Sequence, residues 1–456
     1  MSDEARMSQS DMLAWRLEQD PMLRSIVVVV ALLDASPDWD RFVSTIERMT
    51  QALPAMRRKL VPDRGIAPPQ WVDDEDFDID WHVRRFGIAG SRDLDAVLDF
   101  ARTAGMTAFD PARPMWEYTV LDGLRRDARA ALVMKFHHSL TDGIGAVRIA
   151  AEVMDRERDG TPRPAITDTA EPIRAASLTD SVRWHAATAV GLLRRTVSTG
   201  ARIGTRFVVR PVSTTREVAA TSFAAARFVR PILDTASPVM TRRSTRRHYA
   251  ILEVPTVNLA RAGAAGGGTL NDAFLSAVVL GMRDYHARHG ATVDELRVTM
   301  PMSLRTADDS AGGNLITLVR FVVPAHIAEP KALIEAVHEI VGKIKLDPAI
   351  PLAQELSAGL NLLPAATLGA VLSHVDFLAS DVPGSPVPLY IAGAKIMRQY
   401  VFGPTTGAAF NVTLMSYCGV CTLGVDIDEA AVIDLPTFVE SLREGFARIR
   451  QLGRDG

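Results

Sequence analysis

The sequence contains very little cysteine: Cys418 and Cys421 are the only two cysteines in 456 residues. A structural zinc site needs four ligands, and no further cysteine or histidine lies near this pair to complete one. The surrounding sequence has the character of a strand, on which residues three apart point to opposite faces. We therefore expect two small core residues rather than a redox pair, and the low cysteine content indicates a reducing compartment.

Long apolar runs are also absent. The longest, residues 26–33, has eight residues, whereas a membrane-spanning helix needs roughly 20. This run is rich in valine and is typical of a buried strand. The first eleven residues are polar and acidic, without the basic and apolar regions of a signal peptide, so we predict a cytoplasmic protein.

The sequence has no large excess of charge of either sign. Its formal net charge of −3 argues against a nucleic-acid-binding protein, which usually carries a strong basic excess. Residues 181–250 are a local exception, with thirteen arginines and two acidic residues, and residues 182–197 have the apolar stripe of an amphipathic helix. This region is either an ordinary interdomain helix with a basic solvated side, or a contact with an anionic membrane surface or with ligand phosphates.

The length of the chain exceeds what one hydrophobic core usually supports, so we expect two domains. Strands and helices are mixed in both halves, which indicates an α/β fold. A polar segment that contains proline, residues 155–172, marks a loop or linker. We expect an N-terminal lobe at 1–178, a basic amphipathic linker at 179–247 and a C-terminal lobe at 248–456.

Local patterns predict several elements that bear on function. The spacing of apolar residues predicts helices over 38–53 and 144–154, a strand over 131–136, and a helix that follows the glycine-rich turn before Asn271. In residues 71–83 acidic and apolar residues alternate, which predicts a half-exposed strand with Asp76, Asp78 and Asp80 on one side. A calcium loop there would need glycine where Ile79 stands.

The stretch KFHHSLTDG, residues 135–143, places His137 and His138 in a turn between a strand and a helix, where open sheets present catalytic groups. Adjacent histidines do not fit the four-residue spacing of an HExxH zinc site. No GxSxG elbow occurs in the chain, so nothing supports Ser139 as a nucleophile. A histidine that acts as general base without a protein nucleophile suits acyl transfer to an alcohol, amine or thiol.

The residues after the histidines fit the same interpretation. Asp142 would hold the loop through an arginine, and Gly143 would allow a tight turn. A lone histidine is more often a satisfied core residue, but two histidines at a fixed distance from an Asp-Gly pair favour a functional site.

The sequence resembles a known family at this motif and elsewhere. HHSLTDG resembles the HHxxxDG signature of the CoA-dependent acyltransferase superfamily, which includes chloramphenicol acetyltransferase and peptide-synthetase condensation domains. Other stretches resemble the bacterial wax ester synthase/diacylglycerol acyltransferase family, almost over the whole length and in chain order: 71–84; 110–117, with Met115 in its PLW segment; 271–272, its ND motif; 301–305 with 313–314, its PVSLR…GN block; and 382–384 with 388–390, its NVPG…PLY block. Two positions depart from the family pattern, Asp381 in place of asparagine and Leu23 in place of histidine, and they bear on the acceptor more than on the reaction.

The resemblance implies two chloramphenicol-acetyltransferase-like lobes, each with a mixed sheet flanked by helices, and a tunnel between them. It implies His138 as the base that deprotonates the acceptor hydroxyl and His137 as a supporting residue, with Asp142 and Gly143 shaping the loop. Arg305 or another buried arginine would be the partner of Asp142. Asn271, at a helix N-terminus, would stabilise the oxyanion or orient the base.

The implied reaction moves a long-chain fatty acyl group from acyl-CoA, a co-substrate, to diacylglycerol or a fatty alcohol, with no metal and no other cofactor. The implied partners are these two substrates and, at the periphery, the inner membrane or the surface of a lipid droplet. Two alternatives remain: an acyltransferase of the condensation type that is fed by a carrier protein and acts on a glycolipid or peptide, and a non-catalytic lipid-binding relative.

Overall fold

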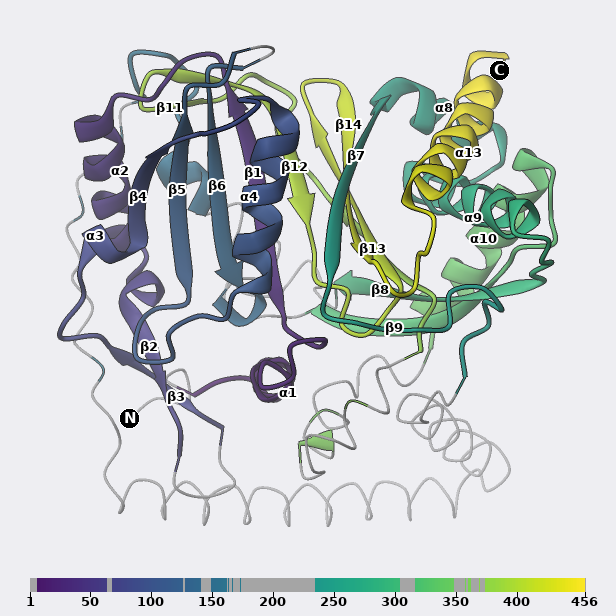
Figure 1. Cartoon of the computed structure of the whole chain (residues 1–456), viewed down its shortest axis with the longest axis horizontal. Helices are drawn as coiled ribbons and strands as arrows, with labels where there is room; N and C mark the ends of the chain where they lie inside the picture. Colours follow the sequence, from purple (N-terminus) through teal and green to yellow (C-terminus); the bar gives the residue numbers. More distant parts are fainter. Residues whose placement is uncertain are drawn as a thin grey trace, which may run out of the picture.

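The computed structural model describes most of both predicted lobes; the described residues are 6–63, 68–125, 128–140, 149–161, 163, 166, 173, 234–303, 316–347, 357, 360–361, 369 and 374–455. Within them the chain forms two six-stranded sheets that lie side by side, each covered by helices (Figure 1). The predicted α/β class with mixed sheets is therefore confirmed. Most of the predicted basic linker, up to residue 233, lies outside the described residues.

The N-terminal sheet has the order β11-β12-β1-β6-β5-β4. Its two central strands, β1 and β6, pair antiparallel and are almost wholly buried, as the valine-rich run predicted. Helix α2 packs on one face of the sheet and helix α4 on the other, which explains why these strands are apolar on both sides. The elements are β1 (Ile26–Leu33), α2 (Trp39–Ala52), β4 (Val83–Gly87), α4 (Leu94–Met106), β5 (Trp116–Asp122), β6 (Ala130–His137), β11 (Tyr390–Ile391) and β12 (Ala394–Phe402).

Shorter elements complete this lobe. They are α1 (Gln9–Leu17), η2 (Pro54–Arg57), the two-stranded sheet β2 (Arg58–Val61) and β3 (Gln70–Asp73), α3 (Ile79–His82) and η3 (His138–Leu140). The half-exposed acidic strand predicted over 71–83 is wrong, because β3 ends at Asp73 and a turn and α3 follow. The Asp78 side chain accepts a hydrogen bond from the Asp80 backbone N–H at 3.0 Å and caps this short helix. The local cap at Asp78 therefore decides the structure of this segment, although its side chains alternate as they would in a strand.

The C-terminal sheet has the order β7-β14-β13-β10-β8-β9. Its helices lie on the face that is turned away from the N-terminal lobe (Figure 1). Helix α9 is buried over most of its length and begins with a capping box between Thr269 and Asp272, which confirms the helix predicted after the glycine-rich turn. The elements are β7 (Arg247–Pro255), α8 (Thr256–Ala265), α9 (Leu270–Arg288), β8 (Glu295–Ser303), β9 (Ile316–Pro324), α10 (Pro330–Lys345), β10 (Phe377–Val382), β13 (Phe410–Tyr417), β14 (Val420–Asp428) and α13 (Leu435–Asp455).

Two strands from the C-terminal half of the chain cross over into the N-terminal sheet and join the two lobes. Strands β11 and β12 belong to the C-terminal half of the sequence, yet β12 pairs with β1 and extends the N-terminal sheet. On the other side of the seam Phe402 stacks on Tyr249 of β7, with ring centroids 4.1 Å apart. Gly424 of β14 lies so close to the Val401 carbonyl that a methyl group there would overlap it. The crossover therefore fixes the contact between the lobes.

The cysteine prediction is half right. Cys421 is buried in the core of the C-terminal lobe, whereas Cys418 is exposed. Cys418 and Gly419 both have positive φ, 49° and 81°, and form the two-residue turn of the β13–β14 hairpin. The sequence around them is two strands and a turn rather than one strand, so the pair does not share a core.

Candidate active site

The two histidines lie where β6 ends and the η3 turn begins. The backbone N–H of His137 donates to the Met115 carbonyl at 3.0 Å, and the backbone N–H of His138 donates to the Ser25 carbonyl at 2.8 Å. In the sheet, His137 is opposite Ile26, the first residue of β1. The turn is therefore anchored to the start of β1, next to the C-terminal lobe.

The His137 side chain is fully buried and is hydrogen-bonded at Nδ1, while its Nε2 atom faces a carboxylate without a hydrogen bond. Its Nδ1 atom is 3.2 Å from the backbone N–H of Ser139 and 2.6 Å from the Ser139 hydroxyl. Since a backbone N–H can only donate, Nδ1 accepts, and the neutral ring carries its proton on Nε2. That atom lies 3.4 Å from Glu18 Oε2. These contacts fit the supporting role expected of His137.

Glu18 was not among the residues singled out in the sequence, yet it connects three parts of the site. Besides facing His137, its Oε2 atom accepts a hydrogen bond from the Ser25 N–H at 3.0 Å, and its Oε1 atom lies 3.8 Å from Arg24 Nε. Ser25 in turn accepts the His138 N–H. One carboxylate therefore ties the end of α1 to the start of β1 and to the histidine turn.

Lys135, two residues before His137 on β6, is a buried charge that sequence reasoning did not single out. It is almost fully buried, with Nζ 3.4 Å from Glu117 Oε1 and 4.0 Å from the centre of the Phe109 ring. Burial lowers the pKa of this amine, and Glu117 opposes that shift. The signal was a lysine within an otherwise apolar strand, which rarely occurs without a partner.

The other predicted site residues are placed less completely. His138 is half-buried, while Asp142, Gly143 and Arg305 lie outside the described residues. The predicted helix over 144–154 is described only from residue 149, and residues 149–153 are helical.

Asn271 lies in the first turn of α9, and its amide Nδ2 is 3.7 Å from the sulfur of Met300. Helix α9 covers the face of the C-terminal sheet that is turned away from the N-terminal lobe (Figure 1). The described contacts therefore do not bring Asn271 and His138 together. The neighbouring Asp272 is buried and accepts hydrogen bonds from Thr269 and His338, each at 2.8 Å, which is a structural arrangement.

The two departures from the family pattern lie in different surroundings. Leu23 is buried in a small cluster with Leu17 and Leu360, close to the histidine turn. Asp381 is exposed near the end of β10. Gly384, in the block that follows Asp381, packs against the Ser416 carbonyl so closely that any side chain would overlap it.

A cavity of about 260 Å³ lies between the lobes. Arg24 and Ile26, which form part of its wall, flank Ser25, the residue that holds the His138 N–H. The lining residues are Pro21, Arg24, Ile26, Gly105, Met106, Thr245, Arg247, Tyr249, Pro404, Thr405 and Asp426. Adjacent strands are about 4.8 Å apart, so the wall at Ile26 is one strand spacing from the backbone of His137.

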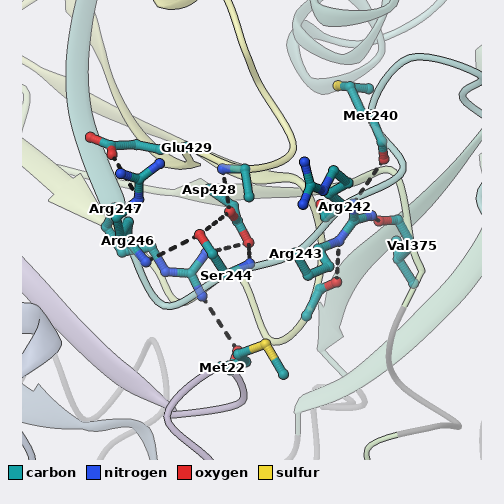
Figure 2. Close-up of polar contacts among 12 residues, drawn as sticks. Met22, Met240, Arg242, Arg243, Ser244, Arg246, Arg247, Val375, Asp428 and Glu429 are labelled. Carbon is teal, nitrogen blue, oxygen red and sulfur yellow. Dashed lines mark hydrogen bonds and ion pairs between the residues drawn. The ribbon is translucent and has the colours of Figure 1, made fainter.

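Charged side chains converge on the C-terminal wall of this cavity. Figure 2 shows Arg247, whose Nη2 atom is 3.4 Å from the Met22 carbonyl of the other lobe. Arg247 Nη1 is 3.9 Å from Asp428 Oδ2, and Asp428 accepts hydrogen bonds from the backbone and hydroxyl of Ser244 at 2.6 and 2.7 Å. Arg243, in the same view, donates to the carbonyls of Met240, Val375 and Gly407, which is a structural role.

Asp426 faces the cavity from β14 and is buried. Desolvation raises the pKa of this carboxyl from 3.8 to about 6; the nearby Arg247 opposes the shift and Asp428 adds to it. The native protein therefore keeps this proton up to about pH 6, whereas the unfolded chain loses it near pH 4.

The Asp426 carboxyl predicts a pH-dependent loss of stability. Because the folded state binds this proton more tightly, its stabilising effect is present below pH 4, is lost between about pH 4 and 6, and stays absent above. We expect Asp426→Asn to raise the free energy of unfolding at pH 7 by up to about 3 kcal/mol and to change it little at pH 4. Urea unfolding at the two pH values measures this, and an equal change at both would contradict it.

Comparison with known proteins settles the family. Residues 7–274 match the model of the wax ester synthase/diacylglycerol acyltransferase catalytic domain, and residues 312–450 match the model of the C-terminal domain of the same family. The chain belongs to this family. A protein of Mycobacterium tuberculosis that carries a provisional diacylglycerol O-acyltransferase name is 34% identical over 99% of this chain and 92% of its own length. Another such protein of this organism is 28% identical over 79% of each chain.

Solved structures confirm the expected architecture of two chloramphenicol-acetyltransferase-like lobes. The wax ester synthase/diacylglycerol acyltransferase of Marinobacter aquaeolei superimposes with a TM-score of 0.62 at 20% identity, covering 98% of this chain and 100% of that one. The first condensation domain of the calcium-dependent antibiotic synthetase gives the same TM-score at 14% identity, with 100% and 97% covered. At these identities the likeness concerns the fold.

Among the described residues, no three His, Cys, Asp or Glu side chains gather as the ligands of a metal ion would. In the same part of the chain, no helix combines the length and the apolar character needed to cross a membrane.

Membership of the family implies that the protein uses an acyl donor and an acyl acceptor.

Proposed function

We propose that the protein transfers a long-chain fatty acyl group from acyl-CoA to the hydroxyl of diacylglycerol or of a fatty alcohol. The products would be triacylglycerol or wax ester, and acyl-CoA is a co-substrate with no further cofactor. The observation that carries the proposal is the pair of histidines at the end of β6, beside a cavity between the lobes, in a chain of this family. The arginine-rich residues 181–250 would give a peripheral contact with the inner membrane or a lipid droplet.

In this mechanism His138 is the general base. Its imidazole takes the proton of the acceptor hydroxyl as the oxygen attacks the thioester carbonyl, and the tetrahedral intermediate then expels the thiolate of coenzyme A, which receives the proton from the imidazolium. His137 does not react: Ser139 and Glu18 hold its ring, so that it fixes the turn on which His138 stands. We propose that Asp142, Gly143 and Arg305 complete this turn.

The test is acyl transfer by the purified full-length protein without any carrier protein. With radiolabelled palmitoyl-CoA and either 1,2-diolein or hexadecanol, we expect labelled triacylglycerol or wax ester and one free thiol for each ester formed. Product that appears only when the acyl group is presented on a carrier protein would support the condensation-type alternative. No thiol release with any acceptor would support a non-catalytic lipid-binding protein.

A further inference from the structure

A row of three charged side chains crosses the N-terminal sheet on the face that α4 covers. Lys135 of β6 is opposite Glu117 of β5 in the strand register, and its Nζ atom is 3.4 Å from Glu117 Oε1. Arg84 of β4 places its Nη1 atom 3.3 Å from Oε2 of the same carboxylate. One carboxylate is therefore shared by two cations, which leaves a positive charge inside the lobe. Because Lys135 is only 2% exposed, water screens this charge poorly.

The positive charge is close to the histidine turn. Lys135 and His137 are two residues apart on β6, so their side chains leave the same face of the strand, at positions separated by roughly 7 Å. Glu18, whose Oε2 atom lies 3.4 Å from His137 Nε2, interacts with both residues. Burial lowers the pKa of Lys135, and the charges of Glu117 and Glu18 oppose that shift.

The Glu18 carboxylate depends on nearby cations. It is largely buried, and the hydrogen bond that the described residues give it comes from the Ser25 N–H, to Oε2. Its Oε1 atom and Arg24 Nε are 3.8 Å apart, and both are buried without a hydrogen bond among the described residues. A carboxylate in such surroundings stays charged only where positive charge compensates the loss of water. Arg24 and Lys135 are the two cations that supply it.

The balance of charge around Glu18 bears on the proton of His137. Nδ1 of this ring accepts from the Ser139 N–H, so the single ring proton is on Nε2, facing the carboxylate. A second proton on the ring would occupy Nδ1 and release Ser139 from the turn. An uncompensated carboxylate would favour that second proton, whereas the ammonium of Lys135 opposes it.

We propose that Lys135 is a positioning residue for acyl transfer: its ammonium balances the Glu18 carboxylate, so that His137 keeps one proton, on Nε2, and the turn holds His138 in place. Lys135 is buried and acts through Glu18 rather than on a substrate. The inference rests on the proposed function, because it assigns Lys135 a role in the reaction of His138.

The experiment is a double-mutant cycle on kcat, with palmitoyl-CoA and diolein as substrates. Lys135→Met removes the positive charge and keeps a linear side chain, while Glu117 retains Arg84 as a partner. Glu18→Gln removes the negative charge and retains an oxygen that can accept from His137. We expect each single variant to lower kcat roughly tenfold or more, because a displacement of about 1 Å at the reacting groups costs up to about a hundredfold. The KM for palmitoyl-CoA should stay within about twofold of the parent's, since neither change removes a substrate contact.

The double variant Lys135→Met/Glu18→Gln decides between compensation and a merely structural role. With both charges removed the balance returns, so we expect kcat within about threefold of the parent's. Independent structural effects would instead multiply the two losses. Where a single variant does not fold, recovery of kcat in the double variant still supports compensation, and no recovery overturns it.

The matched control is Lys59→Met, which removes the lysine of another ion pair in this lobe, with Nζ 2.7 Å from Asp74 Oδ1; its kcat should equal that of the parent. Parental kcat in Lys135→Met, or losses that multiply in the double variant, would overturn the inference. No turnover by the parent with diolein or hexadecanol would instead overturn the proposed function. In that case urea unfolding of the four proteins of the cycle still measures the coupling between Lys135 and Glu18.

Discussion

Replacing His138 with alanine is expected to lower kcat for acyl transfer roughly 10²–10⁴-fold, which corresponds to about 3–5.5 kcal/mol of activation free energy. The reason is that His138 is the proposed base, whereas the ring of the neighbouring His137 is fully buried and its Nδ1 atom already accepts from Ser139. The backbone contact with Ser25 does not involve the side chain, so the variant keeps this anchor of the turn. Single-turnover kinetics with palmitoyl-CoA and diolein measure the loss, and circular dichroism verifies the fold.

His137→Ala is the comparison for this prediction. Its ring contacts Ser139 and Glu18 and is fully buried, so we expect a smaller loss of activity together with a loss of stability. Parental activity in His138→Ala would contradict the assignment of the base. A larger catalytic loss in His137→Ala at unchanged stability would exchange the roles of the two histidines.

Replacing Trp116 with alanine is expected to lower the free energy of unfolding by about 3–5 kcal/mol. Trp116 is fully buried at the start of β5, its indole N–H donates to the Met56 carbonyl at 2.8 Å, and its ring stacks on His82 with centroids 4.4 Å apart. The substitution leaves a large cavity and removes the partner of that carbonyl. Urea unfolding followed by circular dichroism measures the change.

Trp81→Ala is the matched control, because Trp81 is 38% exposed and contacts the guanidinium group of Arg113 at 4.4 Å. We expect its loss to stay below about 1 kcal/mol, the size of an exposed cation–π contact. Equal losses in the two tryptophan variants would show that burial does not decide the role of Trp116. Trp116 of the PLW-like segment and His82 of the earlier family-like stretch therefore pack against each other.

The sequence predicted the elements whose pattern is local. The run of valines identified β1, helical spacing identified α2, and the glycine-rich turn with the apolar residues after it identified α9. The prediction was wrong where one segment carried two conflicting local signals. Asp78 caps a short helix within the segment expected to be an acidic strand. Cys418 occupies a turn that requires positive φ, in a segment expected to be one strand. Both errors arise because backbone capping and turn geometry override the alternation of side chains.

The site was predicted in part for the same reason. The histidine pair is contiguous in the sequence, so its spacing and its place after an apolar strand could be recognised. Glu18, Thr405 and Asp426 are far apart in the sequence, and each is an ordinary residue in its own segment. Only packing brings them near the histidine turn.

By itself, the sequence determined the class of the fold, the family and the histidine turn, because these depend on neighbouring residues and on motifs in chain order. The tertiary structure decided which lobe holds β12, how the two sheets meet at Gly424 and Tyr249, and where a polar cavity remains between them. These features depend on the pairing of strands remote in sequence and on the desolvation of charges between two lobes. Neither the pairing of remote strands nor the desolvation of these charges leaves a periodic or local pattern in the sequence.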